Sequence, residues 1–421
     1  MGETEAEATM SLQPQTREAG PLQGIALLLS GTLPAMGVVL VSPNLSLLNA
    51  AFADVPGGAY LVSIAMTAPA LCIALFSPFA GLIVDRFGRR RALLGALLLY
   101  GLFGMAPLVL DGLPAIIASR AGVGLVESVI MTAAFALFGD YFEGERRNRW
   151  LAYNGAFSAF AATLLYLAGG ALGQYGWRAP FAAYGFSFFI AVFVALAAWE
   201  PAARSARDSA LAKAMPKILR SRQFIAVCAL GFLSSILFFI IPLQMSVFLS
   251  ARGEASTVMI GAIIAVASIG NPIGSYLFRF LSSRTLPQLL ARSYIVGGAG
   301  LVGMAISPSV LAVGLCAFVN QLGCGLLTPA LQAAAMRDLP PHARGRGGGL
   351  LITFMFLGQF VCPLVIMTLT NITSGIDLTF LALGLFSVGS AILAALLPRL
   401  SNRPAQLEDQ APSEPAVVPF I

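Results

Sequence analysis

The stretch GLIVDRFGRRR, residues 81–91, decides the architecture of the whole chain. It places one acid, two glycines and four arginines between two uncharged runs, residues 55–84 and 92–110. A helix needs about 20 apolar residues to cross a bilayer, so each run is long enough to span one. The stretch is therefore a tight, highly charged turn between two membrane-spanning helices.

The composition of the chain is that of an integral membrane protein. Of its 421 residues, 58% are hydrophobic and only 10% are charged, whereas soluble domains carry about 25% charged residues. The formal net charge of +6 does not indicate nucleic-acid binding, because nearly all basic residues lie in short loops between apolar runs. The five cysteines fall inside apolar runs and the single histidine, His342, lies in a loop. We therefore expect no disulfide framework, no metal site and no cofactor.

Apolar runs of spanning length recur twelve times along the chain. Two of them lie in the uncharged run of residues 293–336, which Ser307-Pro308-Ser309 interrupts. We therefore predict an all-α integral membrane protein whose transmembrane helices lie near residues 24–48, 55–84, 92–110, 113–139, 151–172, 179–198, 224–249, 257–278, 293–306, 310–336, 348–369 and 378–397.

The twelve helices fall into two sets of six. The longest internal polar stretch separates the sets, and GSYLFR at residues 274–279 occupies the place that residues 81–86 hold in the first set, with Phe278 in place of the acid. We predict two pseudo-symmetric six-helix bundles with a cytoplasmic linker between them and disordered polar ends. The predicted order is tail, bundle, linker, bundle and tail, at residues 1–22, 23–200, 201–222, 223–400 and 401–421.

The distribution of Lys and Arg predicts the orientation, because short cytoplasmic loops are rich in these residues. With the N-terminus inside, all of the 25 basic residues are cytoplasmic except Arg120 in the membrane and Arg178 and Arg252 outside. We therefore predict a multi-pass protein of the plasma membrane, the inner membrane if the cell is bacterial, with both termini cytoplasmic.

The pattern Gly-x-x-x-Asp-Arg-x-Gly-Arg-Arg, residues 81–90, resembles the signature loop between helices 2 and 3 of the major facilitator superfamily. The resemblance covers about residues 20–400. It implies a transporter that binds its substrate at the midplane between two halves, which rock to expose the site alternately to each side.

The resemblance also implies that the turn latches the two halves together on the cytoplasmic side when the cavity opens outward. Gly81 would let a neighbouring helix approach closely, and Gly88 would permit the tight turn. Asp85 would lie near the N-terminus of the eleventh span, where backbone N–H groups favour an anion.

Asp140 lies at the same membrane face and could pair with Arg86 or Arg89. The alternative interpretation of the turn is a topology signal only. That interpretation explains the arginines but leaves the acid and the glycines without a role.

The fourth span contains the only two charges inside any predicted helix, Arg120 and Glu127. They are seven positions apart, which is about two helical turns, so they share one face. Residues 120–124 resemble the family's span-four motif, Arg-x-x-(Gln)-Gly, with Val123 where Gln is frequent. Burial favours the protonated carboxyl and a nearby arginine favours the ionised one. Alternation between these surroundings would load and release a proton.

We therefore predict Glu127 as the proton-coupling group, with Arg120 as its modulator or as a contact for a substrate anion. The alternative is a fixed pair in which Arg120 and Glu127 neutralise each other. Charges inside a span are costly and usually face the interior or a water-filled cavity.

Several uncharged polar residues inside the spans are candidates for the wall of a substrate cavity. Each could equally form a hydrogen bond between helices. In the family that the chain resembles, spans one, four, seven and ten line the cavity. The candidates are Gln244, Asn320, Gln321, Asn154 and Tyr166.

The fifth span ends in LYLAGG, residues 165–170, followed by Gly173. Proton antiporters of the family often carry Gly-Pro-x-x-Gly-Gly here, and this chain has the Gly pair without the Gly-Pro. We interpret these glycines as sites of close helix packing.

The function expected from these features is secondary active transport by alternating access. The preferred interpretation is proton-coupled efflux, as an antiporter, of a lipophilic or amphipathic small molecule such as a drug or metabolite. The alternative is proton-coupled uptake of a small organic anion or other nutrient. An enzyme would need clustered catalytic groups within the spans, and a receptor a sizeable extramembrane domain. The expected partners are a small-molecule substrate, protons and the lipid bilayer, with no nucleic acid, and the protein is expected to be a monomer.

Overall fold

The computed structural model describes residues 19–201, 222–254, 256–281, 285–337, 339 and 341–400. Most of the predicted linker and both predicted tails lie outside these ranges. Within them, twelve helical segments are long and apolar enough to cross a membrane, as the sequence predicted.

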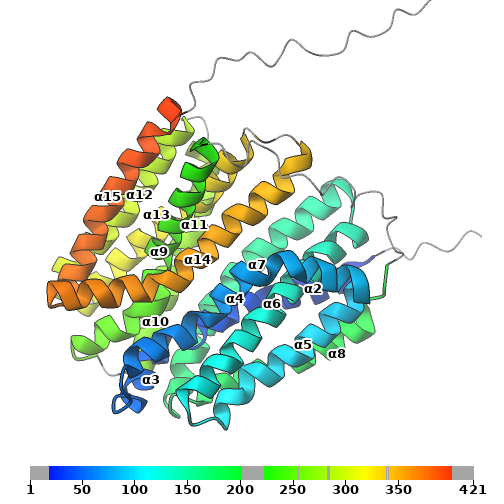
Figure 1. Cartoon of the computed structure of the whole chain (residues 1–421), viewed down its shortest axis with the longest axis horizontal. Helices are drawn as coiled ribbons and strands as arrows, with labels where there is room; N and C mark the ends of the chain where they lie inside the picture. Colours follow the sequence, from blue (N-terminus) through cyan, green and yellow to red (C-terminus); the bar gives the residue numbers. More distant parts are fainter. Residues whose placement is uncertain are drawn as a thin grey trace, which may run out of the picture.

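The helices form two halves that pack side by side, the first in blue to green and the second in green to red (Figure 1). The first half contains α2 (Pro21–Val39), η1 (Ser42–Asn44), α3 (Leu45–Ala51), α4 (Gly58–Phe87), α5 (Arg89–Met105), η2 (Ala106–Leu108), α6 (Leu113–Tyr141), α7 (Gly144–Gly173), η3 (Ala179–Gly185) and α8 (Phe186–Ala197). The second half contains α9 (Arg222–Ala251), α10 (Thr257–Ser268), α11 (Gly270–Leu281), α12 (Leu286–Ile306), α13 (Val310–Arg337), α14 (Pro341–Thr373) and α15 (Ile376–Leu400).

Two ends of the bundle are distinguished below. The terminal face is the end at which α2 begins and α15 ends, and it also carries the turn between α4 and α5. The distal face is the opposite end, where α3 lies and α4 begins.

Prolines explain where two spans depart from a single continuous helix. The eighth span, predicted as one helix, is divided at Ile269 into α10 and α11. Pro272 has no N–H to donate to the carbonyl of Ser268, four residues earlier, so the helical ladder is interrupted there. In the first span, Pro43 lies in the short η1 helix between α2 and α3.

Each half contains the same internal link between two helices. In the first half the Tyr100 hydroxyl, on α5, donates to the carbonyl oxygen of Leu33 on α2 at 2.7 Å. In the second half the Tyr294 hydroxyl, on α12, donates to the carbonyl oxygen of Leu230 on α9. Both tyrosines are fully buried. The two links join equivalent spans, which supports the predicted pseudo-symmetry.

Uncharged hydrogen bonds join the two halves at the distal face. The Ser42 hydroxyl donates to the carbonyl of Pro242, and the Ser246 hydroxyl donates to the carbonyl of Pro43 at 2.9 Å. Between the end of α14 and the start of α4, the Asn371 amide donates to the Tyr60 hydroxyl at 3.0 Å. These contacts hold the distal ends of the halves together.

Glycines near the end of α7 bring the backbones of the two halves into contact. A Cβ at Gly170 would lie 2.6 Å from the carbonyl oxygen of Thr257 on α10. This distance leaves no space for a methyl group. Gly169 and Gly173 lie as closely against Leu40 and Asn44. The predicted packing role of these three glycines is confirmed.

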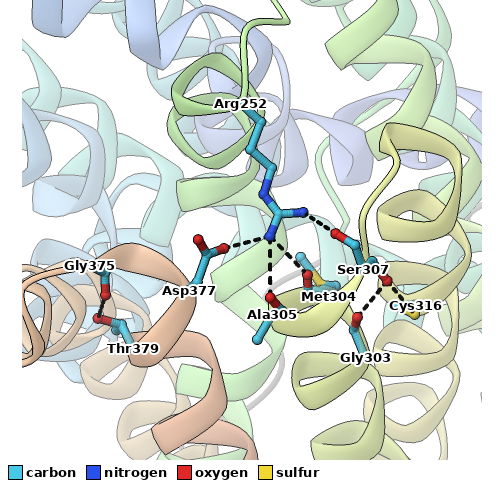
Figure 2. Close-up of polar contacts among 9 residues, drawn as sticks. All are labelled: Arg252, Gly303, Met304, Ala305, Ser307, Cys316, Gly375, Asp377 and Thr379. Atoms are coloured by element: carbon cyan, nitrogen blue, oxygen red, sulfur yellow. Dashed lines mark hydrogen bonds and ion pairs between the residues drawn. The ribbon is translucent and has the colours of Figure 1, made fainter.

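One arginine joins three loops of the second half at the distal face (Figure 2). Arg252, directly after α9, donates to the carbonyl oxygens of Ser307 at 2.8 Å and Met304 at 3.4 Å, at the end of α12. It also pairs with Asp377 at the start of α15, at 2.6 Å. Its guanidinium carbon lies 4.3 Å from the centre of the Phe248 ring. The loops between the spans of this half are therefore tied to one another.

We expect Gly170→Ala to weaken the closed distal face, because its methyl group would meet the Thr257 carbonyl. Such overpacking costs about 1–3 kcal/mol. Electron-paramagnetic-resonance distances between spin labels at Asp54 and Ile372, in a chain whose native cysteines are replaced, should lengthen. The matched control is Gly155→Ala on the same helix, where a Cβ would meet nothing within 4 Å. Equal distances in both variants would contradict this account.

Candidate functional site

Gly88 alone makes the turn between α4 and α5. It has a φ of +88°, a conformation that other residues adopt at a cost. Because α4 ends at Phe87 and α5 begins at Arg89, a single residue reverses the chain direction. The predicted tight turn and the predicted role of Gly88 in it are both present.

Glu200, which the sequence analysis did not single out, caps the helix that follows this turn. The backbone N–H groups of Arg90 and Arg91 donate to its two carboxylate oxygens at 3.3 and 3.2 Å. A carboxylate at a helix N-terminus accepts from free backbone donors and complements the helix dipole. The Arg90 guanidinium also donates to the carbonyl of Ala195 on α8 at 2.8 Å.

Asp140 pairs with Arg89, one of its two predicted partners, and the Asp140 side chain is only 8% exposed. The pair lies within the first half and joins α5 to the end of α6. Asp85 is exposed, and a Cβ at Gly81 would meet nothing within 4 Å. The close helix approach predicted at Gly81 is thus not found in this conformation. The latch concerns a closed terminal face and stays a prediction.

A cavity of about 400 Å³ lies between the two halves at mid-height of the bundle. Its wall is mainly apolar and aromatic, and it holds one ionisable acid, Glu127. The residues around it include Pro34, Gly37, Pro69, Tyr166, Phe238, Phe239, Pro242, Asn271, Pro272, Gln321, Phe356 and Gln359.

Glu127 lies on the wall of this cavity without a partner. The residue is 2% exposed, and its Oε2 atom has no hydrogen bond in the part of the chain that the structure describes. The ion pairs found there do not include one between Glu127 and Arg120. The alternative of a fixed pair between these two side chains is therefore not observed.

Arg120 is held by neutral groups instead. One guanidinium nitrogen donates to the Tyr184 hydroxyl at 2.6 Å, and another donates to the carbonyl oxygen of Gly37 on α2. The guanidinium carbon also lies 5.3 Å from the centre of the Tyr184 ring. Arg120 is fully buried and is not among the residues that line the cavity. Its role in this conformation is to join α6 to α2 and η3.

Gly37 lies close to both charged side chains. A Cβ built on it would lie 3.5 Å from Glu127 Oε2 and 3.7 Å from a guanidinium nitrogen of Arg120. The backbone of α2 therefore passes close to both groups. The Gly37 carbonyl accepts from the Arg120 guanidinium, whereas no ion pair joins Arg120 to Glu127 in the described residues.

Two of the five predicted cavity residues, Tyr166 and Gln321, line the cavity. Asn154 lines a separate cavity of about 190 Å³ between α2, α6 and α7. The structure does not place Asn320 on the main cavity, because its amide donates to the Gly297 carbonyl at 2.9 Å, inside the second half. Gln244 is buried toward the distal end of α9, also outside the lining.

Asn271 and Gln359 also line the cavity. They are polar residues of the eighth and eleventh spans, which are not among the four spans that the family resemblance favours for the cavity wall. Prolines inside helices were the available signal, since four of them lie on the wall. Interrupted helices commonly form the binding sites of membrane proteins. Pro242 shows why polar residues gather there: it cannot donate to the Phe238 carbonyl, and Gln321 donates to that carbonyl instead, at 3.0 Å.

We expect Arg120→Leu to destabilise the protein, because the Gly37 carbonyl and the Tyr184 hydroxyl would each lose the donor that Arg120 supplies. An unsatisfied buried polar group costs about 1–3 kcal/mol. The melting temperature in detergent should fall clearly. Arg178→Leu is the control, because its pair with Asp111 is at the surface and such pairs contribute about 0–1 kcal/mol. Similar losses in both variants would refute the structural role of Arg120.

Comparison with known proteins shows the family to which the chain belongs. The sequence model of the Major Facilitator Superfamily matches residues 27–363 and, in a second match, residues 289–420. A curated relative, the tetracycline resistance protein, class E, of Escherichia coli, is 26% identical over 363 residues, which cover 81% of this chain and 86% of that protein.

Solved structures share the fold. A bacterial homologue of the human lysosomal transporter Spinster, in an inward-facing and unoccupied conformation, has a TM-score of 0.73 at 13% identity and covers 91% of this chain and 98% of its own. The D-xylose–proton symporter has a TM-score of 0.74 at 14% identity and covers 88% of this chain and 96% of its own. At these identities the likeness concerns the fold alone.

Proposed function

Because the chain belongs to the Major Facilitator Superfamily, we propose that it exports a lipophilic or amphipathic small molecule in exchange for protons. Its family and fold are those of multi-pass membrane transporters, which bind small-molecule substrates and often use protons. We propose the direction of transport, the coupling ion and the substrate class.

The observation that carries the proposal is the unpaired carboxyl group of Glu127 on the wall of the central cavity. Ionisable residues inside a membrane span are costly and mark ion or proton pathways. A carboxyl group without a fixed partner can be neutral when the cavity is dry or apolar and ionised when water or a cation enters. The same group can therefore take up a proton in one conformation and release it in the other.

The chemistry of the cavity supports a lipophilic substrate. Its wall is formed largely by prolines, phenylalanines and small aliphatic residues, with three amides, two serines and one tyrosine besides Glu127. Apolar pockets with a few placed polar groups bind drug-sized molecules by surface burial. Export agrees with the name of the tetracycline resistance protein, since a transporter protects a cell from an antibiotic by moving it outward.

The alternative, uptake of an organic anion, depended on Arg120 as the anchor for a carboxylate. Arg120 is buried against Tyr184 and Gly37 and does not line the cavity. The observation that would favour anion uptake is therefore missing, and export remains the preferred function.

The proposal includes the orientation predicted from the sequence, with the terminal face in the cytoplasm and the protein acting as a monomer in the plasma membrane. The distal face, closed by Ser42, Ser246 and Gly170, would then face outward. In this orientation the conformation described here is closed toward the outside. Asp85 is exposed at the cytoplasmic face and does not form the latch.

We expect Glu127→Gln to abolish concentrative transport driven by a pH gradient, because the amide cannot bind and release the coupling proton. The measurement is uptake into inside-out proteoliposomes with an imposed pH gradient, across a panel of lipophilic drugs. Downhill exchange of substrate should persist, since the cavity keeps its shape. Glu145→Gln, an exposed acid at the start of α7, is the control and should transport normally. Undiminished pH-driven accumulation by Glu127→Gln would exclude the coupling role.

We expect Asp85→Asn to shift the conformational equilibrium toward the cytoplasm-open state. Loss of an anion at a helix N-terminus costs about 1 kcal/mol, or roughly a fivefold change in the equilibrium. Distances between spin labels across the terminal face should lengthen on average, and the transport rate should fall. Asp54→Asn, at the distal face, is the control. Full transport with an unchanged distance distribution would reduce the turn to a topology signal.

A further inference from the structure

A second cavity, separate from the central one, opens on the outer side of the first half. It has a volume of about 530 Å³ and lies between α4 and α5, with α6 as its floor. Both α4 and α5 pack closely against α6 but hardly contact each other beyond the Gly88 turn. The result is an apolar groove, named here the lateral groove, which Ile83, Phe87, Gly95, Leu99, Leu125 and Val129 help to line.

Two arginines stand at the terminal end of the lateral groove. Of the four arginines of the turn, Arg89 forms an ion pair with Asp140, and Arg90 donates to the carbonyl oxygen of Ala195. The other two, Arg86 and Arg91, line the groove and are exposed. Arg86 lies 5.9 Å from the centre of the Phe87 ring, and the Arg91 guanidinium has no partner among the residues that the structure describes.

The groove therefore combines unused positive charge with an apolar channel. The carboxylate of Asp85 does not line it. Arginine guanidinium groups bind phosphate oxygens with charge-assisted hydrogen bonds. Basic pockets between transmembrane helices at the cytoplasmic side are typical sites for anionic lipid head groups.

The depth of the lateral groove matches one leaflet. Arg91 and Leu99 are eight positions apart on α5, or about 12 Å along the helix axis. Half of a typical hydrocarbon core is about 15 Å thick. A head group held at the arginines would thus place one acyl chain along the groove, against the exposed side chains of Ile83, Leu99 and Leu125.

We propose that the lateral groove is a binding site for an anionic glycerophospholipid of the leaflet at the terminal face. Arg86 and Arg91 hold its phosphodiester, and one acyl chain lies between α4 and α5 on the surface of α6. The site is independent of the central cavity, and it stands whether or not the protein exports drugs.

Native mass spectrometry of the purified full chain tests the proposal, with phosphatidylglycerol and phosphatidylcholine of identical acyl chains as probes. The wild type should retain phosphatidylglycerol preferentially. The double variant Arg86→Gln with Arg91→Gln removes two lipid-facing charges. It should weaken phosphatidylglycerol binding about thirtyfold. Arg86→Lys with Arg91→Lys should retain most of the binding. The matched control removes two exposed arginines of α7 at the same face, Arg147→Gln with Arg149→Gln, and should bind normally.

A second variant fills the groove without changing charge. A Cβ at Gly95 would meet nothing within 4 Å, so Gly95→Leu leaves the helix packing intact and occupies the path of the acyl chain. This variant should also lose the preference for phosphatidylglycerol. Its melting temperature in detergent should equal that of the wild type, which separates loss of the site from loss of the fold.

Three results would overturn the proposal. The first is unchanged phosphatidylglycerol binding in the Arg86 and Arg91 glutamine variant, or an equal loss in the α7 control. The second is normal binding in folded Gly95→Leu. The third is displacement of the lipid by millimolar inorganic phosphate, which would indicate a site for free phosphate.

Discussion

The absence of water inside the bilayer is the constraint on which the rest of this structure depends. Every backbone group that a helix leaves unpaired there must find another partner. Pro242 frees the Phe238 carbonyl, and Gln321 occupies it at 3.0 Å. Pro329 frees the Gly325 carbonyl, and the Ser275 hydroxyl occupies it at 2.9 Å. Interrupted helices and polar side chains therefore occur together, and the central cavity lies where they gather.

The same constraint gives Glu127 its importance. Its Oε2 is the only carboxyl oxygen among the buried side-chain atoms without a partner in the described residues. Arg120, two turns away on the same helix, donates to the Gly37 carbonyl and the Tyr184 hydroxyl. These neutral groups leave the charge of Arg120 without a counter-ion, and its Nε has no hydrogen-bond partner in the described residues. The carboxyl group of Glu127, by contrast, lies on the cavity wall with its Oε2 unbonded.

The number of spans could be predicted because charges and prolines separate them. Their limits were less predictable, since α12 and α14 begin at Leu286 and Pro341, seven residues before the predicted spans. The Ser307-Pro308-Ser309 break between α12 and α13 is an example. The rotation of each helix could not be predicted, since lipid-facing and core-facing positions are equally apolar and leave no periodic contrast. Asn320 and Gln321 are neighbours in the sequence, yet only Gln321 reaches the cavity.

Contacts between distant segments were equally hidden. Glu200 caps the helix that begins at Arg89, and nothing in its local sequence indicates that the end of α8 lies beside this turn. The pairing of Asp140 with Arg89 could be anticipated because opposite charges at one membrane face have few other partners. The charged turn was therefore recognised from its residues, but its attachment to the bundle required the three-dimensional structure.

At the distal face, the Arg252 guanidinium joins the loops of the second half to one another. No single loop there can therefore move as a separate lid. Exposure of that side must then displace the whole half. Each ion pair in the described residues lies within one half. The polar contacts between the halves at this face are made by serine hydroxyls, an amide and backbone groups. Salt screens charges and leaves such neutral contacts largely untouched. Ionic strength would therefore act on the two faces of the molecule unequally, with little influence on these contacts between the halves and more on the arginine-rich turn at the opposite end.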